Sequence, residues 1–302
     1  MPISSSLATQ TPIMGVLSVA TLPGAYNPQL WQGPLESIIA QAEQEALALT
    51  TGGVNVIWIR FPTLTAINPA SLASAGAIIT AIKRLCSLPL GIDWGPHSTE
   101  ALALAWAHQC SFTHLPVATG SVLTASGWIS NQSAPLQQAF AQWHIPNQSL
   151  IVSTSVTPHH QLPLSNAPKN CFSEMVLATA HHISQWPQPT ALCLPQSALA
   201  EEDWPALLAA LELKAPRVLR WLVASNDPLA CSRLAAYCNG IILDDVLRNP
   251  TQENPDSSKG SLSVPQIEHW SRGLKSAIAG NTDARCLPAP TCANEPESLF
   301  AV

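Results

Sequence analysis

The sequence predicts an α/β protein built as a closed (β/α)₈ barrel. Short apolar runs bounded by Pro and Gly indicate buried strands, and the first of them spans residues 13–26 and stops at Pro23-Gly24. Each run is followed by about twenty Ala- and Leu-rich residues with helical spacing. This phrase occurs eight times, and strands that alternate with helices imply parallel pairing. Eight such units in a domain of this length are what a closed barrel requires.

The first half of the chain contains four of the strand–helix units. A helix with its apolar face from Leu35 to Leu47 ends at the glycine pair Gly52-Gly53. Two more helices begin at Asn68-Pro69 and at Ser98, which we expect to act as N-caps. The stretch that holds Thr119-Gly120 and Gly127-Trp128 is predicted as a loop. Strands after the first are predicted at 54–59, 88–93 and 112–115.

The second half repeats the pattern with longer polar insertions. Helices are predicted from Ser133-Ala-Pro135, over 172–183, after an Asp203 cap, from 226–228, and over 267–278. Strands are predicted at 149–155, 191–194, 217–223 and 240–243, with polar insertions at 156–170 and 249–263. The barrel thus spans residues 13–280, between an N-terminal arm at 1–12 and a flexible C-terminal tail at 281–302.

Composition narrows the function classes. Charged residues make up only 11% of the chain, against about 25% in ordinary globular domains. A net charge of -6 with no basic stripe argues against nucleic acid as a partner. Eight cysteines without a Cys-x-x-Cys pair indicate reduced, buried thiols, and the Cys231 and Cys238 pair is typical of core packing. With no apolar run long enough to cross a bilayer, we expect a cytoplasmic protein, or one peripheral on a membrane.

Chemistry in such barrels sits where the strands end. Asp93 and Asp244 are candidate catalytic residues as an acid and base pair, with His114 and His159 as further candidates. Structural ion pairs also place charges in clefts, so the alternative is that both carboxylates satisfy loop amides or Arg60. No lysine ends a predicted strand, so the sequence offers no residue at the strand ends that could form an imine with a substrate. The predicted strand ends are Ser18, Arg60, Asp93, His114, Thr154, Pro195, Ser225 and Asp244-Asp245.

Bound phosphate, cofactors and metals are not expected. No glycine lies between Ser225 and Asn239, where barrels of this type cradle phosphate, and Asp244-Asp245 would repel a dianion by about 1 to 4 kcal/mol per charge pair at ~4 Å. If both aspartates point into solvent instead, the cradle still lacks glycines. The histidines of the strand-end loops have no metal-ligand spacing. These histidines are His97, His114, His159 and His160.

Five segments in order resemble the BtpA family over residues 13–280. The resemblance implies a phosphate-binding-type (β/α)₈ barrel, and cyanobacterial members of the family are linked to photosystem I biogenesis at the thylakoid membrane. The segments are Gly15 to Gly24, Ala48 to Ile57, Leu88 to Ile92, Phe112 to Gly120 and Asn239 to Ile242.

The chain also departs from the family pattern at its polar positions. Ser18 stands where the family has a histidine, Arg60-Phe61 where it has Glu-Asn, and His114-Leu-Pro116 where it has Arg-x-Asn. Asp244-Asp245-Val246 replaces a glycine-serine turn, whereas His159 keeps a histidine of the fifth loop. These replacements imply that an ancestral polar site has been largely dismantled.

Two function classes follow. The first is a photosystem I biogenesis or stability factor that is a non-catalytic barrel and contacts the photosystem I assembly machinery as its protein partner. Ten tryptophans favour this class, because aromatic residues concentrate binding energy at interfaces. The alternative is an enzyme that processes a sugar or nucleoside. An open polar barrel end would favour the enzyme, and a plug of Phe61, Trp94 and Trp128 the scaffold. The candidate contact residues are Trp31, Trp128, Trp186 and Trp204.

Overall fold

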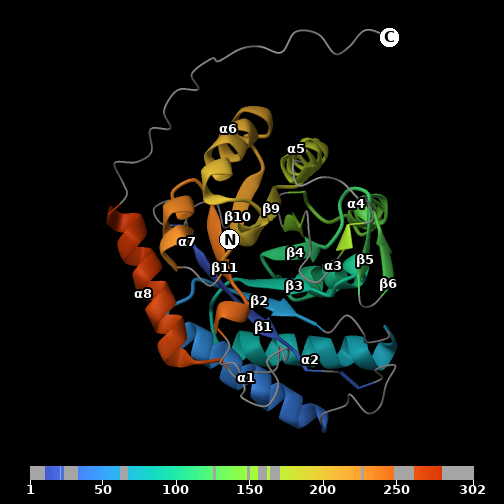
Figure 1. Ribbon diagram of the computed structural model, residues 1–302. Helices are drawn as coiled ribbons and strands as arrows, with labels where there is room; N and C mark the ends of the chain where they lie inside the picture. The colour runs from blue at the N-terminus through green and yellow to red at the C-terminus, as the bar shows by residue number, and fades with distance from the viewer. Residues whose placement is uncertain are drawn as a thin grey trace, which may run out of the picture.

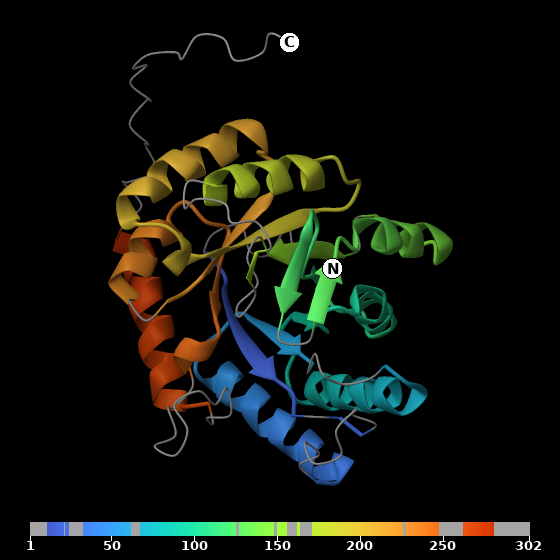
Figure 2. The ribbon, with the colours of Figure 1, turned by 45° about the vertical axis from the view of Figure 1, so that its right-hand side comes forward.

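The computed structural model is a closed barrel of eight parallel strands surrounded by helices (Figures 1 and 2). Going round the barrel, the strand order is β1-β11-β10-β9-β7-β4-β3-β2. This confirms the predicted fold class. The structure describes residues 11–20, 22–23, 33–61, 67–124, 127–147, 150–155, 162–163, 171–225, 228–247 and 262–280. The predicted arm and tail lie almost wholly outside these ranges and stay predictions.

The barrel strands fall close to their predicted positions. They are β1 (Ile13–Ser18), β2 (Val56–Arg60), β3 (Leu90–Asp93), β4 (Phe112–Leu115), β7 (Ile151–Ser155), β9 (Thr190–Pro195), β10 (Leu219–Val223) and β11 (Gly240–Leu243). The helices are α1 (Leu35–Thr51), α2 (Pro69–Leu85), α3 (Ser98–Ala107), α4 (Ser133–Gln142), α5 (Cys171–Ser184), α6 (Trp204–Lys214), α7 (Pro228–Ala235) and α8 (Val264–Gly280).

A small antiparallel sheet occupies the stretch predicted as a loop between β4 and α4. Its strands β5 (Ser121–Thr124) and β6 (Gly127–Ser130) form a hairpin, and β8 (Leu162–Pro163) pairs with β5 from beyond β7. The loop prediction was therefore wrong. The third strand comes from about forty residues downstream, and a local pattern cannot predict such pairing.

Helix starts follow the predicted capping chemistry in one case of three. Asn68 caps α2, and its side chain accepts from the Ser71 backbone N–H at 2.9 Å in a capping box. Ser98 is instead the first residue of α3, and its hydroxyl donates to Gln132. Asp203 precedes α6 with helical backbone angles and makes no cap hydrogen bond, because a short 3₁₀ turn leads directly into the helix.

Aromatic side chains fill the interior of the barrel. Trp58, Phe112 and Trp221 meet edge to face with ring centroids 5.1 to 6.3 Å apart. A Cβ atom on Gly91 would lie 1.9 Å from Cζ of Phe112, so the bare glycine makes room for the ring. Other (β/α)₈ barrels use mainly Val, Ile and Leu here. The barrel interior is therefore filled by aromatic rings, which form a packed floor beneath the side chains at the strand ends.

Cys86, Cys110, Cys193, Cys231 and Cys238 form no disulfide, and all but Cys86 are buried. Cys238 lies beyond the end of α7, so it does not share a helix face with Cys231. Within the described residues, no helix combines the length and apolar character that crossing a membrane would need.

Candidate functional site

A layer of polar side chains lies at the C-terminal end of the barrel, above the aromatic floor. The parallel register aligns Ser18 with Arg60, Arg60 with Asp93, and His114 with Ser153. Because successive residues of a strand alternate between interior and exterior, aligned residues share one face. We call Arg60, Asp93, His114, Ser153, Ser155, Cys193 and Asp244 the polar layer.

Arg60 connects the two candidate carboxylates. Its Nε lies 3.2 Å from Oδ2 of Asp93, and its Nη1 lies 2.6 Å from Oδ2 of Asp244. Both carboxylates are buried, while the arginine side chain keeps 34% of its surface exposed. The alternative reading, in which Arg60 and a loop amide satisfy the carboxylates, therefore describes the structure. The alternative in which Asp244 and Asp245 both point into solvent is wrong for Asp244, because closure of the barrel turns it onto Arg60.

Arg60, Asp93 and Asp244 form a charged triad, and their charges balance only in part. Burial opposes a charged guanidinium, but the attraction of Asp244 and Asp93 outweighs that cost and raises the pKa of Arg60 above its ordinary value. The second oxygen of Asp93, Oδ1, accepts from the Gly95 backbone N–H at 2.9 Å. One permanent cation thus faces two carboxylates, so these three side chains together carry a formal charge of minus one.

His114 is buried beside the triad with both ring nitrogens engaged. Its Nδ1 lies 3.0 Å from the hydroxyl of Ser153, and its Nε2 lies 3.3 Å from the hydroxyl of Ser155. Ser153 donates to the Thr113 carbonyl at 3.3 Å, so it accepts from Nδ1–H and Ser155 donates to Nε2. Burial, with a smaller opposing effect of Asp93, lowers the pKa of His114 to about 4. The imidazole is therefore neutral at neutral pH.

Three members of the polar layer were not among the predicted strand ends. Ser153 and Ser155 contact His114, and Cys193 aligns with Ser155 across β7 and β9. Burial, followed by the nearby Asp93, raises the pKa of the Cys193 thiol above its ordinary value. Thr154, which was predicted here, aligns instead with Leu115 and Leu192 of the outer core. Alternation along the predicted strand 149–155 puts Ser153 and Ser155 on one face and Thr154 on the other, so it could have grouped the two serines.

The aromatic plug that would favour the scaffold over the enzyme does not form. Phe61 and Trp94 stack at 5.0 Å in the core between strands and helices, because each follows an inward-facing strand end and so points outward. Trp128 lies on β6 and is 60% exposed. Trp204 is buried, with its indole N–H donating to the Gln196 carbonyl at 3.3 Å, so its prediction as a contact residue was wrong. Trp186 is half-buried against the core, and Trp31 lies outside the described residues.

The BtpA family model matches residues 9–256, which is most of the chain and includes the whole polar layer. The chain belongs to the BtpA family. The photosystem I biogenesis protein BtpA of Synechocystis is 31% identical over 143 residues, which are 45% of this chain and 48% of the relative. An uncharacterized protein of Pyrococcus abyssi is 26% identical over 43% of this chain and 51% of its own length. The chain thus spans about half the length of the curated relatives that it matches.

Solved structures resemble this BtpA-family chain in fold alone. A dihydropteroate synthase of Xanthomonas albilineans aligns with a TM-score of 0.50 at 13% identity, covering 93% of this chain and 94% of that one. A 7,8-dihydropteroate synthase of Vibrio fischeri aligns with a TM-score of 0.50 at 14% identity, covering 92% and 97%. Identity this low says nothing about residue roles.

Several candidate residues of this BtpA-family chain cannot be placed. His159 and His160 lie outside the described residues, as does the side chain of Asp245. Among the described residues, no group of three or more His, Cys, Asp or Glu side chains could hold a metal ion.

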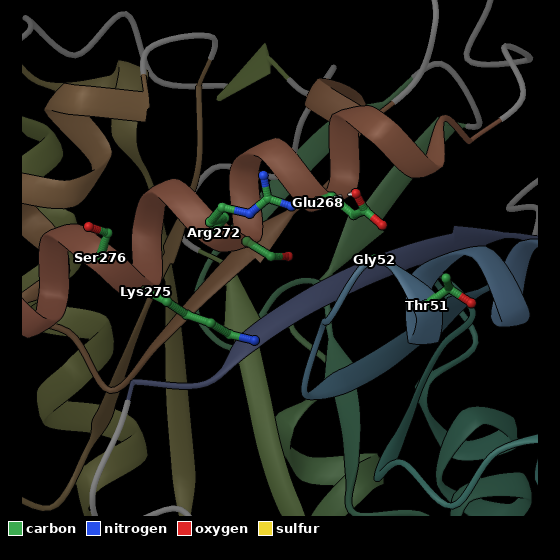
Figure 3. Close-up of a pocket in the computed structure, with 7 residues that line it drawn as sticks. Thr51, Gly52, Glu268, Arg272, Lys275 and Ser276 are labelled. Atoms are coloured by element: carbon green, nitrogen blue, oxygen red, sulfur yellow. Dashed lines mark ion pairs between the residues drawn. The ribbon is translucent and has the colours of Figure 1, made fainter.

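A surface cavity lies away from the polar layer. It has a volume of about 570 Å³ and is found between the end of α1 and residues 268–276 of α8 (Figure 3). Lys275 donates there to the Gly53 carbonyl at 2.9 Å, and Glu268 pairs with Arg272 at 3.7 Å. The lysine thus caps the carboxyl end of α1, an arrangement that stabilises the fold.

Proposed function

We propose that this chain is a photosystem I biogenesis or stability factor that acts through protein contacts at the thylakoid and not through catalysis. Family membership and the name of the Synechocystis relative, a photosystem I biogenesis protein, support the first half of the proposal. The observation that supports the second half is the position of Arg60 between Asp93 and Asp244.

A general acid or base must exchange a proton with a substrate that it touches. Both carboxylates are buried and each binds a guanidinium that never loses its proton. His114 is buried too, and each of its nitrogens already has a serine partner. The members of the polar layer therefore satisfy one another's hydrogen bonds and charges. Such a network resembles one that holds strands in position more than a site that binds a substrate.

The test uses the native host. Deleting the gene should lower the ratio of photosystem I to photosystem II, measured by low-temperature fluorescence, and returning the gene should restore it. A variant with Arg60→Gln, Asp93→Asn and Asp244→Asn removes all three charges but keeps hydrogen-bonding groups of similar shape. We expect this variant to restore the ratio as well as the unaltered chain does.

One observation favours the enzyme alternative. Arg60 is one-third exposed, and polar groups from several strands converge at the end where (β/α)₈ enzymes bind substrates. If the charge-free variant accumulates as a folded protein and fails to restore the ratio, the chain is an enzyme acting on a sugar, nucleoside or related small molecule. An unchanged ratio in the deletion strain would remove the photosystem assignment.

A further inference from the structure

Large apolar side chains are exposed mainly at one end of the barrel. Every helix of a (β/α)₈ barrel returns to the face where the strands begin, which we call the N-terminal face. Five of the six large exposed hydrophobic residues of the described chain lie in or near the last turn of a helix on this face. These five are Leu47 on α1, Leu85 on α2, Trp106 on α3, Trp143 after α4 and Leu213 on α6.

Two of these five helix ends, those of α2 and α6, are also basic. Lys83 and Arg84 end α2, Lys214 ends α6, and Arg217 follows it, all with exposed side chains. The described residues at the helix ends and in the turns that follow them include one carboxylate, Glu212, which pairs with Arg220. These residues are 47–55, 83–89, 106–111, 142–147, 181–189, 212–218, 236–239 and 275–276.

The described residues at the opposite end of the barrel include several acidic side chains. Exposed carboxylates occur at or before helix starts, with Glu36 in the first turn of α1 and Glu174 in the first turn of α5. Three more, Glu201 to Asp203, precede α6. Helix dipoles favour this distribution of charge, but they do not explain why Leu85 and Leu213 are exposed beside the basic residues.

We propose that the N-terminal face docks directly on an anionic lipid bilayer. The anchors are single side chains spread over the ends of five helices, where a protein interface would concentrate them in one central patch. Leucine inserts into the acyl boundary, tryptophan sits at the headgroup level, and lysine and arginine attract anionic headgroups. The proposal goes beyond the proposed function and does not depend on it.

Charge removal gives the first test. The purified chain is mixed with vesicles of phosphatidylcholine containing one-third phosphatidylglycerol, and with vesicles of phosphatidylcholine alone, and bound protein is separated by flotation. We expect binding to the anionic vesicles that weakens as salt is raised. A variant with Arg84→Gln, Lys214→Gln and Arg217→Gln should bind on the order of 100-fold more weakly, since each basic residue near the surface contributes about fivefold.

The tryptophans provide a matched comparison. Trp106 and Trp143 on the N-terminal face are 39% and 41% exposed, and Trp128 on β6 at the other end is 60% exposed. Trp106→Ser with Trp143→Ser should reduce vesicle binding, and Trp128→Ser should leave it unchanged. Thermal unfolding of each variant confirms that it is folded.

Three results would overturn the proposal. The first is equal binding to neutral and anionic vesicles, and the second is an unchanged affinity of the charge variant. The third is an equal loss of binding from Trp128→Ser. If light scattering instead shows a dimer that these N-terminal-face variants dissociate, while vesicles bind no protein, the face joins two copies of the chain and the lipid proposal is wrong. None of these results bears on the complementation test in the native host.

Discussion

Acidification should destabilise the protein through His114 before most carboxylates titrate. Burial lowers the pKa of this side chain from 6.5 to about 4 in the folded state. Between these two values the unfolded chain binds a proton that the folded chain does not, so stability falls as the pH is lowered from 6.5 toward 4. Above pH 6.5 the contribution is complete and the free energy of unfolding does not change through this group.

The magnitude follows from the two pKa values. Each unit of difference corresponds to about 1.4 kcal/mol, so His114 should remove about 2 kcal/mol of stability at pH 5 and about 3 kcal/mol at pH 4. This loss is a large part of the typical free energy of unfolding of a protein, which is about 5 to 15 kcal/mol. The lost stability reflects the cost of placing an imidazolium in the buried interior of the barrel, away from water.

Urea unfolding at a series of pH values, with the unaltered chain and His114→Gln side by side, measures this effect. Other titrating groups contribute to both proteins, so the difference between their profiles isolates His114. Glutamine cannot take up the proton, and the variant should show a shallower loss of stability between pH 6.5 and 5. Parallel profiles would refute the reasoning, as would an NMR titration that places the folded pKa of His114 near 6.5.

Three further substitutions test the packing of the barrel. Asp244→Asn removes the closer partner of Arg60 and should lower the free energy of unfolding by about 2 kcal/mol, less than for a fully buried pair because the arginine is partly exposed; adding Arg60→Met should recover part of the loss in a double-mutant cycle. Gly91→Ala drives a methyl group into the ring of Phe112 and should cost about 3 kcal/mol, while the double variant with Phe112→Leu should be more stable than Gly91→Ala alone. His144 follows α4 with a φ of 52°, so His144→Gly should raise stability by about 1 kcal/mol in thermal unfolding, and a lower stability would contradict the strain argument.

The sequence determined the barrel and the residues that end several of its strands. Alternating apolar runs and helical periodicity are local properties, and they placed all eight barrel strands within a few residues. Arg60, Asp93 and His114 were identified as strand ends for the same reason. The cap at Asn68 was also readable, because its partner Ser71 lies only three residues away.

Tertiary structure decided which tryptophans are exposed. Trp204 starts a helix and Trp106 lies within the apolar pattern of another, yet the first is buried and the second exposed. The antiparallel sheet of β5, β6 and β8 was likewise unreadable, since its third strand comes from a separate segment. Exposure of an amphipathic side chain depends on which neighbouring helix covers it, and sequence periodicity does not record the neighbour.

The ion pairs of Arg60 depend on closure of the barrel. Asp244 is 184 residues away along the chain, and no local pattern connects the two. Strand β1 pairs with β2 on one side and with β11 on the other, so closure brings the end of β2 and the residue after β11 to the same mouth. The sequence supplied one cation and two carboxylates at strand ends, and the register of the closed barrel decided that they bind one another.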